Sequence, residues 1–138
     1  MADDDKPLDP EIEAYVFALL SGGLYAPASV SDEPEVIISA WEIMAVNGAW
    51  GKTHHVVGLA DGVGRVSSPI EAFDPAAKTV TTRSNRIYHL DDAPAHMSEI
   101  RDIEYVRAAW LRRNNVTGDD YADASSAYRK AIMEREHG

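Results

Sequence analysis

Two adjacent histidines, His54 and His55, are the first residues whose types could do chemistry, because imidazole is a common metal ligand. They lie in residues 49–60, which the turn signals on either side predict to be extended, and neighbouring side chains on a strand point to opposite faces. One ion could therefore take only one of them, with His89, Asp91 or Asp92 as alternative partners, and no H-E-x-x-H spacing is present. We predict no metal site and expect both histidines on an edge strand or at the boundary of the core.

The other stretches that suggest chemistry fail on spacing or position. Residues 58–64 hold three glycines but lack the order of a phosphate-binding loop, so we expect a turn between strands. Ser67, Ser68 and Ser84 fall in predicted strands, without the G-x-S-x-G turn of serine hydrolases. The chain has no cysteine, which excludes disulfides, thiolate nucleophiles and cysteine-based zinc sites. We expect no catalytic residue and no cofactor, so the sequence predicts a protein that is not an enzyme.

A locally basic strand offers an alternative ligand site. Its members are Lys78, Arg83, Asn85, Arg86 and His89, with Tyr88 among them. A strand that displays arginine, asparagine and aromatic side chains can bind single-stranded nucleic acid or an acidic ligand by stacking and charge. Two of the residues, Arg86 and Tyr88, share the strand face that alternation assigns to the core. The alternative function is therefore a nucleic-acid or small-ligand binding protein that uses the strand of residues 83–88.

The net charge of −10 helps to distinguish a nucleic-acid partner from a protein partner, and this charge is unevenly distributed along the chain. Residues 1–45 hold ten acids and one base, residues 46–90 three acids and five bases, and residues 91–138 ten acids and seven bases. This charge disfavours direct nucleic-acid binding, which depends on neutralising phosphates, and favours an electropositive protein partner, although simple solubility would also explain it.

We therefore predict a non-enzymatic protein-interaction module. Its partner would be an electropositive surface such as that of a nucleic-acid-binding complex, and the charge suits a phage or mobile-element inhibitor of anti-CRISPR or antirestriction type. The acidic residues expected to contact the partner are Glu11, Asp32, Glu33, Glu35, Glu99, Asp102, Asp119 and Asp120.

Residues 65–90 are predicted to position the basic strand as a β-hairpin. Two runs rich in β-branched and aromatic residues, 66–73 and 79–90, flank the turn sequence DPAAK. The expected cross-strand pairs are Phe73 with Thr79, Ala72 with Val80, Ile70 with Thr82, Ser68 with Ser84 and Val66 with Arg86. The face of the last four pairs continues to Tyr88 and Leu90 and should be buried. The other face should carry an ion pair between Glu71 and Arg83.

The rest of the chain is predicted to supply helices. Residues 1–8 should be disordered, and Asp9 and Pro10 begin an amphipathic helix that ends at Gly22-Gly23. Residues 35–50 fit either a helix or a strand, and a strand is favoured for residues 41–46. Apolar residues at three- and four-residue spacing predict a helix over 97–110 and a last helix after Asp119 or Asp120, with Tyr121 on its apolar stripe.

Together these elements predict an α+β fold: a small antiparallel meander of three to four strands, flanked by one amino-terminal and two carboxy-terminal helices. The 138 residues suit a single domain over residues 9–138. No apolar run approaches the roughly 20 residues that span a bilayer, and the first residues are acidic where a signal peptide is basic. We expect a cytoplasmic protein without membrane contact, and Trp50 and the Tyr121 stripe are candidates for a homodimer contact.

The hairpin resembles a recurrent pattern in small, uncharacterised accessory proteins of proteobacteria and their phages. The matching residues are Ser67-Ser68-Pro69-Ile70, then Phe73-Asp74, then residues 82–90 with Thr82, Ser84, Tyr88 and Leu90. In those proteins a strand of the type T-S-x-I leads through a short turn to a strand of the type T-x-S-x-x-Y-x-L, and Ser67 departs from the usual threonine. The resemblance implies a compact β-meander with flanking helices and brings no activity or catalytic residue with it.

Overall fold

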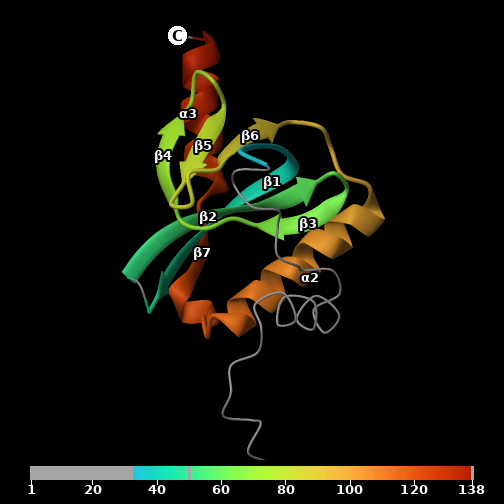
Figure 1. The fold of residues 1–138 in the computed structure, drawn as a ribbon, viewed down its shortest axis with the longest axis vertical. Coiled ribbons are helices and arrows are strands. Elements are labelled where there is room, and N and C mark those ends of the chain that lie inside the picture. The colour runs from blue at the N-terminus through green and yellow to red at the C-terminus, as the bar shows by residue number, and fades with distance from the viewer. Residues whose placement is uncertain (1–32, 50, 138) are drawn as a thin grey trace, which may run out of the picture.

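One mixed β-sheet forms the centre of the molecule, with an α-helix packed on each face (Figure 1). The computed structural model describes residues 33–49 and 51–137. The elements are β1 (Glu35–Gly48), β2 (Gly51–Ala60), β3 (Val63–Val66), β4 (Ile70–Asp74), β5 (Thr79–Thr82), β6 (Ile87–Asp91), α2 (Met97–Arg113), the 3₁₀ turn η2 (Gly118–Asp120), β7 (Tyr121–Asp123) and α3 (Ser125–His137). The strands lie in the order β3-β2-β1-β6-β5-β4, and β7 pairs with β1. Only the β1–β6 pair is parallel among these strands.

The long strand β1 contains a bulge that lets its two halves take different partners. Its pairing with β2 is interrupted between Ser39 and Glu42, where Ala40 has a φ of 49°. The first half pairs with β6 and the second half with β7. The extra residue also keeps apolar side chains on one face, because the buried cluster beside α3 takes Val36 and Ile38 before the bulge and Trp41 and Ile43 after it.

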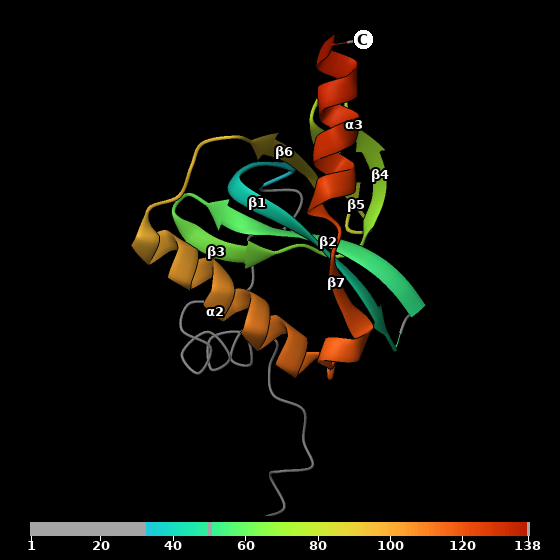
Figure 2. The ribbon, with the colours of Figure 1, turned by 180° about the vertical axis from the view of Figure 1, so that it is seen from behind.

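The two faces of the sheet bury separate apolar clusters. Figures 1 and 2 show α2 running beneath β2 and β3, and α3 standing against the opposite face. The cluster on the α3 side is built from Val36, Ile38, Trp41, Ile43, Val56, Ala60, Val80, Tyr88, Leu90 and Ile132. The cluster on the α2 side is built from Met44, Val46, Val57, Leu59, Ile103, Val106 and Ala109. Each helix is therefore held by the apolar stripe that it presents to the sheet.

The glycine-rich stretch is the β2–β3 hairpin, which confirms the predicted turn between strands. Asp61 and Gly62 form the turn with φ values of 54° and 78°. The other two glycines allow close packing: a Cβ on Gly58 would lie 2.6 Å from the Ser39 carbonyl oxygen, and a Cβ on Gly64 would lie 2.7 Å from Val106 Cγ1. These glycines thus serve the turn and the packing of the sheet.

The predicted hairpin is real near its turn, but its register is wrong there by one residue. Asp74, not Phe73, lies opposite Thr79, because Lys78 adopts a φ of 57° and shortens the turn. An irregularity between Ile70 and Ala72 then restores the predicted pairing of Ile70 with Thr82. Alternation correctly predicted the buried residues of the second run, Val80, Thr82, Arg86, Tyr88 and Leu90. It was wrong for Ser84, which is exposed on the β5–β6 turn, and for Ala72, which is exposed because of the shifted register. The ion pair between Arg83 Nε and Glu71 Oε1 is present at 3.3 Å.

The predicted fold is wrong in the size and topology of the sheet. The sheet has seven strands and is mixed, whereas three to four antiparallel strands were expected. The two carboxy-terminal helices are present as α2 and α3, and they pack on opposite faces of the sheet. Each predicted hairpin strand is in fact two short strands. Residues 67–69, ending in Pro69 without a backbone donor, separate β3 from β4, which lie at opposite ends of the sheet, and residues 83–86 turn β5 into β6.

The strand prediction for residues 41–46 and the helix prediction for residues 97–110 are confirmed. The last helix begins at Ser125, later than predicted, because Tyr121 belongs to β7. Ser125 joins the two elements: its hydroxyl accepts from the buried Ile43 N–H at 2.8 Å and donates to Asp123 Oδ1 at 2.5 Å. Neither helix of the described residues is long and apolar enough to cross a membrane. The predictions for residues 1–8, for the helix beginning at Asp9 and for Trp50 lie outside the described residues.

Candidate functional site

A pocket of about 360 Å³ lies where three segments meet: the β3–β4 linker, the β5–β6 turn and the carboxy-terminal end of α2. Its walls are His55, Val66, Ser67, Ser68, Pro69, Arg83, Trp110 and Asn114. This volume is within the range of small-molecule sites. None of these lining residues is acidic, in a chain whose net charge is −10.

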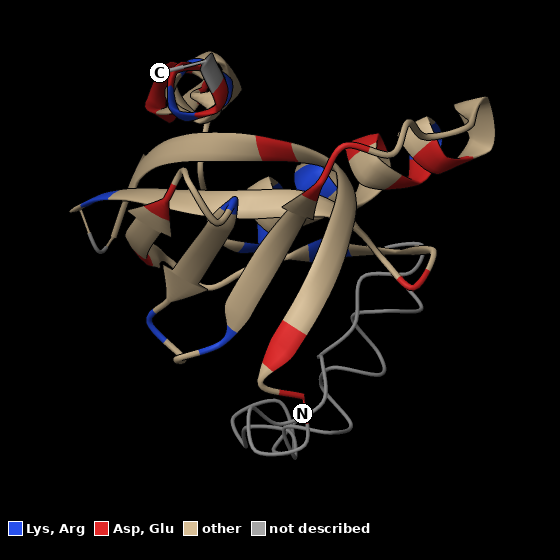
Figure 3. Cartoon of the chain, turned by 90° about the horizontal axis from the view of Figure 1, so that it is seen from above, with Lys and Arg blue, Asp and Glu red and all other residues tan. Residues whose placement is uncertain are grey.

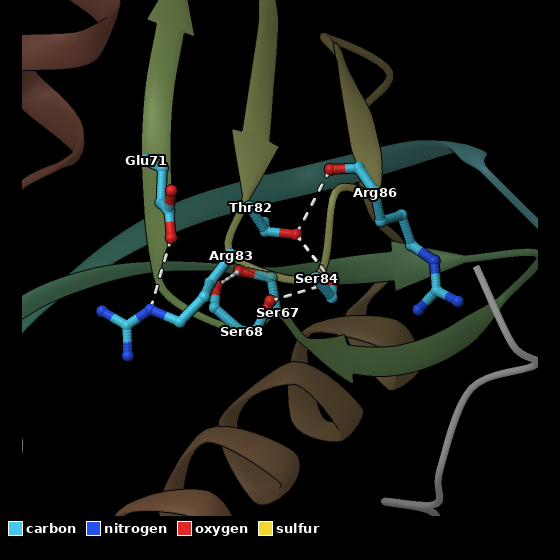
Figure 4. Close-up of polar contacts among 7 residues, drawn as sticks. All are labelled: Ser67, Ser68, Glu71, Thr82, Arg83, Ser84 and Arg86. Atoms are coloured by element: carbon cyan, nitrogen blue, oxygen red, sulfur yellow. Dashed lines mark hydrogen bonds and ion pairs between the residues drawn. The ribbon is translucent and has the colours of Figure 1, made fainter.

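The linker and the turn are held together by hydrogen bonds (Figure 4). The Arg83 N–H donates to the Pro69 carbonyl at 2.8 Å, and the Ser68 and Ser84 hydroxyls are bonded at 3.1 Å. The turn is closed by Thr82, whose N–H and hydroxyl both donate to the Arg86 carbonyl, at 3.0 and 3.2 Å. The β3–β4 linker and the β5–β6 turn therefore form one unit at the pocket wall.

Arg83 is the cation of the pocket. It stands on the tight turn, and its side chain is 55% exposed. Its Nε meets Glu71 Oε1 at 3.3 Å, and no other partner of its guanidinium is seen within residues 33–49 and 51–137. An exposed pair of this kind contributes little, about 0–1 kcal/mol, and its guanidinium can exchange partners. The terminal nitrogens can thus donate to an anion in the pocket.

The other residues of the predicted basic strand are not gathered around this pocket. Figure 4 shows Arg86 on the opposite side of the turn from Arg83, and its buried Nε donates to the Glu33 carbonyl at 2.9 Å. Lys78 pairs with Glu136 at 2.7 Å, and His89 Nε2 lies 2.7 Å from Glu35 Oε1. Asn85, with a φ of 69°, is a residue of the turn itself.

His55 forms part of the pocket wall as a neutral ring. Its Nδ1 lies 2.9 Å from the Ser67 carbonyl oxygen, which can only accept, so Nδ1 carries the proton. Its Nε2 then accepts from the Thr53 hydroxyl at 2.8 Å. Burial lowers the pKa of His55 below its ordinary value of 6.5, opposed by the Ser67 bond and assisted by the charges of His54 and Arg83. The ring lies 4.6 Å from that of Trp110, at 53°, and so supports the indole.

The neighbouring His54 points to the other side of the sheet, as strand geometry predicts. Its Nδ1 lies 2.8 Å from the Tyr128 hydroxyl of α3, whereas His55 faces α2. Across residues 33–49 and 51–137, no three histidine or acidic side chains stand close enough together to hold a metal ion.

The comparisons with known proteins find nothing similar. No protein-family model, no curated protein and no solved structure matches the chain.

The acidic residues predicted to contact a partner are spread over the molecule. Figure 3 shows acidic and basic segments interspersed over the sheet and the helices. Glu33 pairs with Arg65 at 2.7 Å, and Glu99 accepts from the His96 N–H at the start of α2. Asp102 and Asp119 are exposed, Asp120 is half-buried in η2, and Glu11 and Asp32 lie outside the described residues. Residues 33–138 hold 16 acids and 12 bases, a net charge of −4, so most of the charge of −10 comes from residues 1–32.

Sequence reasoning named many residues of the pocket wall but did not bring them together. It treated His55 as a histidine of the core boundary, Ser67 and Ser68 as strand residues and Arg83 as part of a basic strand, and it did not single out Trp110 or Asn114. No local signal joins these residues, because they come from separate elements that only the fold brings together.

Proposed function

We propose that the chain is a binding protein for a small anionic ligand, held in the pocket between the β3–β4 linker, the β5–β6 turn and α2. The observation that carries this proposal is the exposed guanidinium of Arg83 at a pocket whose lining holds no carboxylate. The function is the alternative that the basic strand suggested, narrowed from the whole strand to Arg83.

The local charge supports an anion even though the chain as a whole is acidic. Charges more than about 8 Å apart in water are largely screened at physiological salt, so the nearest groups set the local field. They are Arg83 and its exposed partner Glu71, which lies outside the pocket lining and which an incoming anion must displace from the guanidinium. Arg83 offers a delocalised cation with several donors in one plane, which suits a phosphate or a carboxylate. The hydroxyls of Ser68 and Ser84 stand beside it, but they donate along a chain that ends at the Arg86 carbonyl, so they fix the turn that carries Arg83.

A titration with inorganic phosphate tests the proposal. Isothermal calorimetry should detect binding to the unaltered protein, and Arg83→Gln should weaken it about tenfold or more, since a charge-assisted hydrogen bond is lost. The matched control is Arg101→Gln, which removes an exposed arginine of α2 away from the pocket. Equal affinities for R83Q and R101Q would contradict the proposal, as would the absence of any binding by the unaltered protein.

A second proposal is the interaction with an electropositive protein that the acidic composition predicts, such as an inhibitor would make with a nucleic-acid-handling complex. The observation that favours it is the exposure of Asp102 and Asp119, neither of which has an ion pair within the described part of the chain. Cross-linking in a host lysate, followed by mass spectrometry, should recover one basic protein with the unaltered chain and much less with D102N/D119N. Equal recovery with both would contradict it. Either function would be exerted in the cytoplasm, which a chain without cysteine favours.

A further inference from the structure

The pocket is larger than a bare anion requires. Beside the polar residues, it is walled by Val66, Pro69 and Trp110. A small anion at Arg83 would leave these walls in contact with water, whereas a ligand that also has a flat apolar part would cover them. The ligand inferred here rests on the proposed anion-binding function and extends it from the charged group to the rest of the molecule.

Trp110 is held ready for a planar ligand. It is half-buried, and the His55 ring that touches it is fixed by its two hydrogen bonds to Ser67 and Thr53. An indole that is already immobilised loses little conformational entropy when a ring stacks on it. Stacking of a nucleobase on an aromatic side chain contributes enough to change affinity about fivefold to a hundredfold.

Asn114 adds an acceptor at the edge of the pocket. Its Nδ2 donates to the Trp110 carbonyl at 2.8 Å, which fixes the orientation of the amide. Its Oδ1 has no partner within residues 33–49 and 51–137 and can accept a hydrogen bond from an amino group. An exocyclic amino group of adenine or cytosine would suit it, and a carbonyl at the same position would be rejected.

We propose that the ligand is a free nucleoside 5′-monophosphate with an amino-bearing base, such as AMP. The phosphate pairs with the guanidinium of Arg83, the base stacks on Trp110, and the amino group donates to Asn114 Oδ1. Each of these contacts uses a residue of the pocket wall whose own interactions leave the required group available.

Calorimetry with AMP, IMP, ribose 5-phosphate and inorganic phosphate separates the nucleotide proposal from the broader proposal of anion binding. AMP should bind about tenfold or more tightly than ribose 5-phosphate or inorganic phosphate, because only AMP carries the base. IMP keeps a base that can stack on Trp110 but has a carbonyl in place of the amino group, so it should bind more weakly than AMP and more tightly than ribose 5-phosphate. Equal affinities for AMP and ribose 5-phosphate would overturn the nucleotide inference and leave anion binding standing, whereas no binding of any phosphate compound would overturn both.

Two variants test where the base lies, and a trinucleotide tests whether the ligand is a free nucleotide or the end of a nucleic-acid strand. Trp110→Phe keeps a ring in the α2-side cluster and should lower only the affinity for AMP. Asn114→Ala removes the acceptor Oδ1 and should therefore remove the preference for AMP over IMP. If W110F weakened ribose 5-phosphate as much as AMP, the base would not lie on Trp110. The trinucleotide pApApA should bind no more tightly than AMP, and clearly tighter binding would assign the site to the end of a nucleic-acid strand instead.

Discussion

Replacing Gly64 by alanine tests whether the glycines of the β2–β3 hairpin serve packing. A Cβ on Gly64 would lie 2.7 Å from Val106 Cγ1 and 2.9 Å from Val106 Cγ2. Both distances are shorter than carbon atoms tolerate, and Val106 is only 1% exposed, so it has little space into which to move. The contact joins β3 to α2, the helix that carries Trp110 to the pocket.

The expected cost follows from two opposing effects. Overpacking of a tight interior destabilises a protein by about 1–3 kcal/mol, whereas Gly→Ala stabilises by about 0.4–1 kcal/mol through the unfolded chain. Gly118→Ala measures the second effect, because a Cβ there would meet no atom within 4 Å. The free energy of unfolding of G64A should therefore be about 1–3 kcal/mol lower than that of G118A.

Urea unfolding followed by far-ultraviolet circular dichroism measures these free energies. A double-mutant cycle then isolates the contact, because Val106→Ala removes both carbon atoms that the new Cβ would meet. In the V106A protein, G64A should no longer destabilise. The reasoning is refuted if G64A and G118A are equally stable, or if G64A costs the same with and without Val106.

Two further predictions concern the joint before α3 and the buried histidine. Ser125→Ala leaves the buried Ile43 N–H without its acceptor and should lower the free energy of unfolding by about 1–3 kcal/mol. The control Ser126→Ala changes an exposed serine and should alter the free energy by less than about 0.5 kcal/mol. Equal effects of the two variants in urea unfolding would contradict the prediction. Because burial lowers the pKa of His55 in the folded state, the unfolded state binds more protons below pH 6.5, so the stability that His55 provides at neutral pH should be lost as the pH falls below 6.5. A titration of the His55 ring by NMR should give a midpoint below 6.5, and a midpoint at or above that value would contradict the neutral ring.

Local patterns predicted the elements, and long-range pairing decided the topology. Alternation identified the buried face of β5 and β6, since each side chain there is sorted only by its own strand. The parallel pairing of β1 with β6 joins residues about 50 positions apart, and it depends on the bulge at Ala40, which no local signal announces. The register error at the turn has a similar origin, because Lys78 adopts a left-handed conformation that its residue type does not favour.

The sequence predicted the positions of candidate-site residues only where alternation along a single strand determines which side chains are buried. The alternation that placed Arg86 on the buried face was correct, and the same alternation left Arg83 exposed. Trp110 and Asn114 reach the pocket only because α2 packs on β2 and β3, which the sequence does not specify. The sequence indicates only a basic strand, whereas the fold places one of its cations, Arg83, at the wall of a pocket.

The break of the expected hairpin into separate strands is what creates this pocket. Had residues 66–73 formed one straight strand, Ser68 and Pro69 would have continued the sheet beside Ser84. Instead the chain crosses from β3 at one end of the sheet to β4 at the other, and the linker is fixed to the β5–β6 turn by the bond from Arg83 N–H to the Pro69 carbonyl. No strand fills the space between that crossing and α2, so loop side chains line it together with side chains of β2, β3 and α2. Arg83 stands at its wall because the turn that carries Arg83 also anchors the linker.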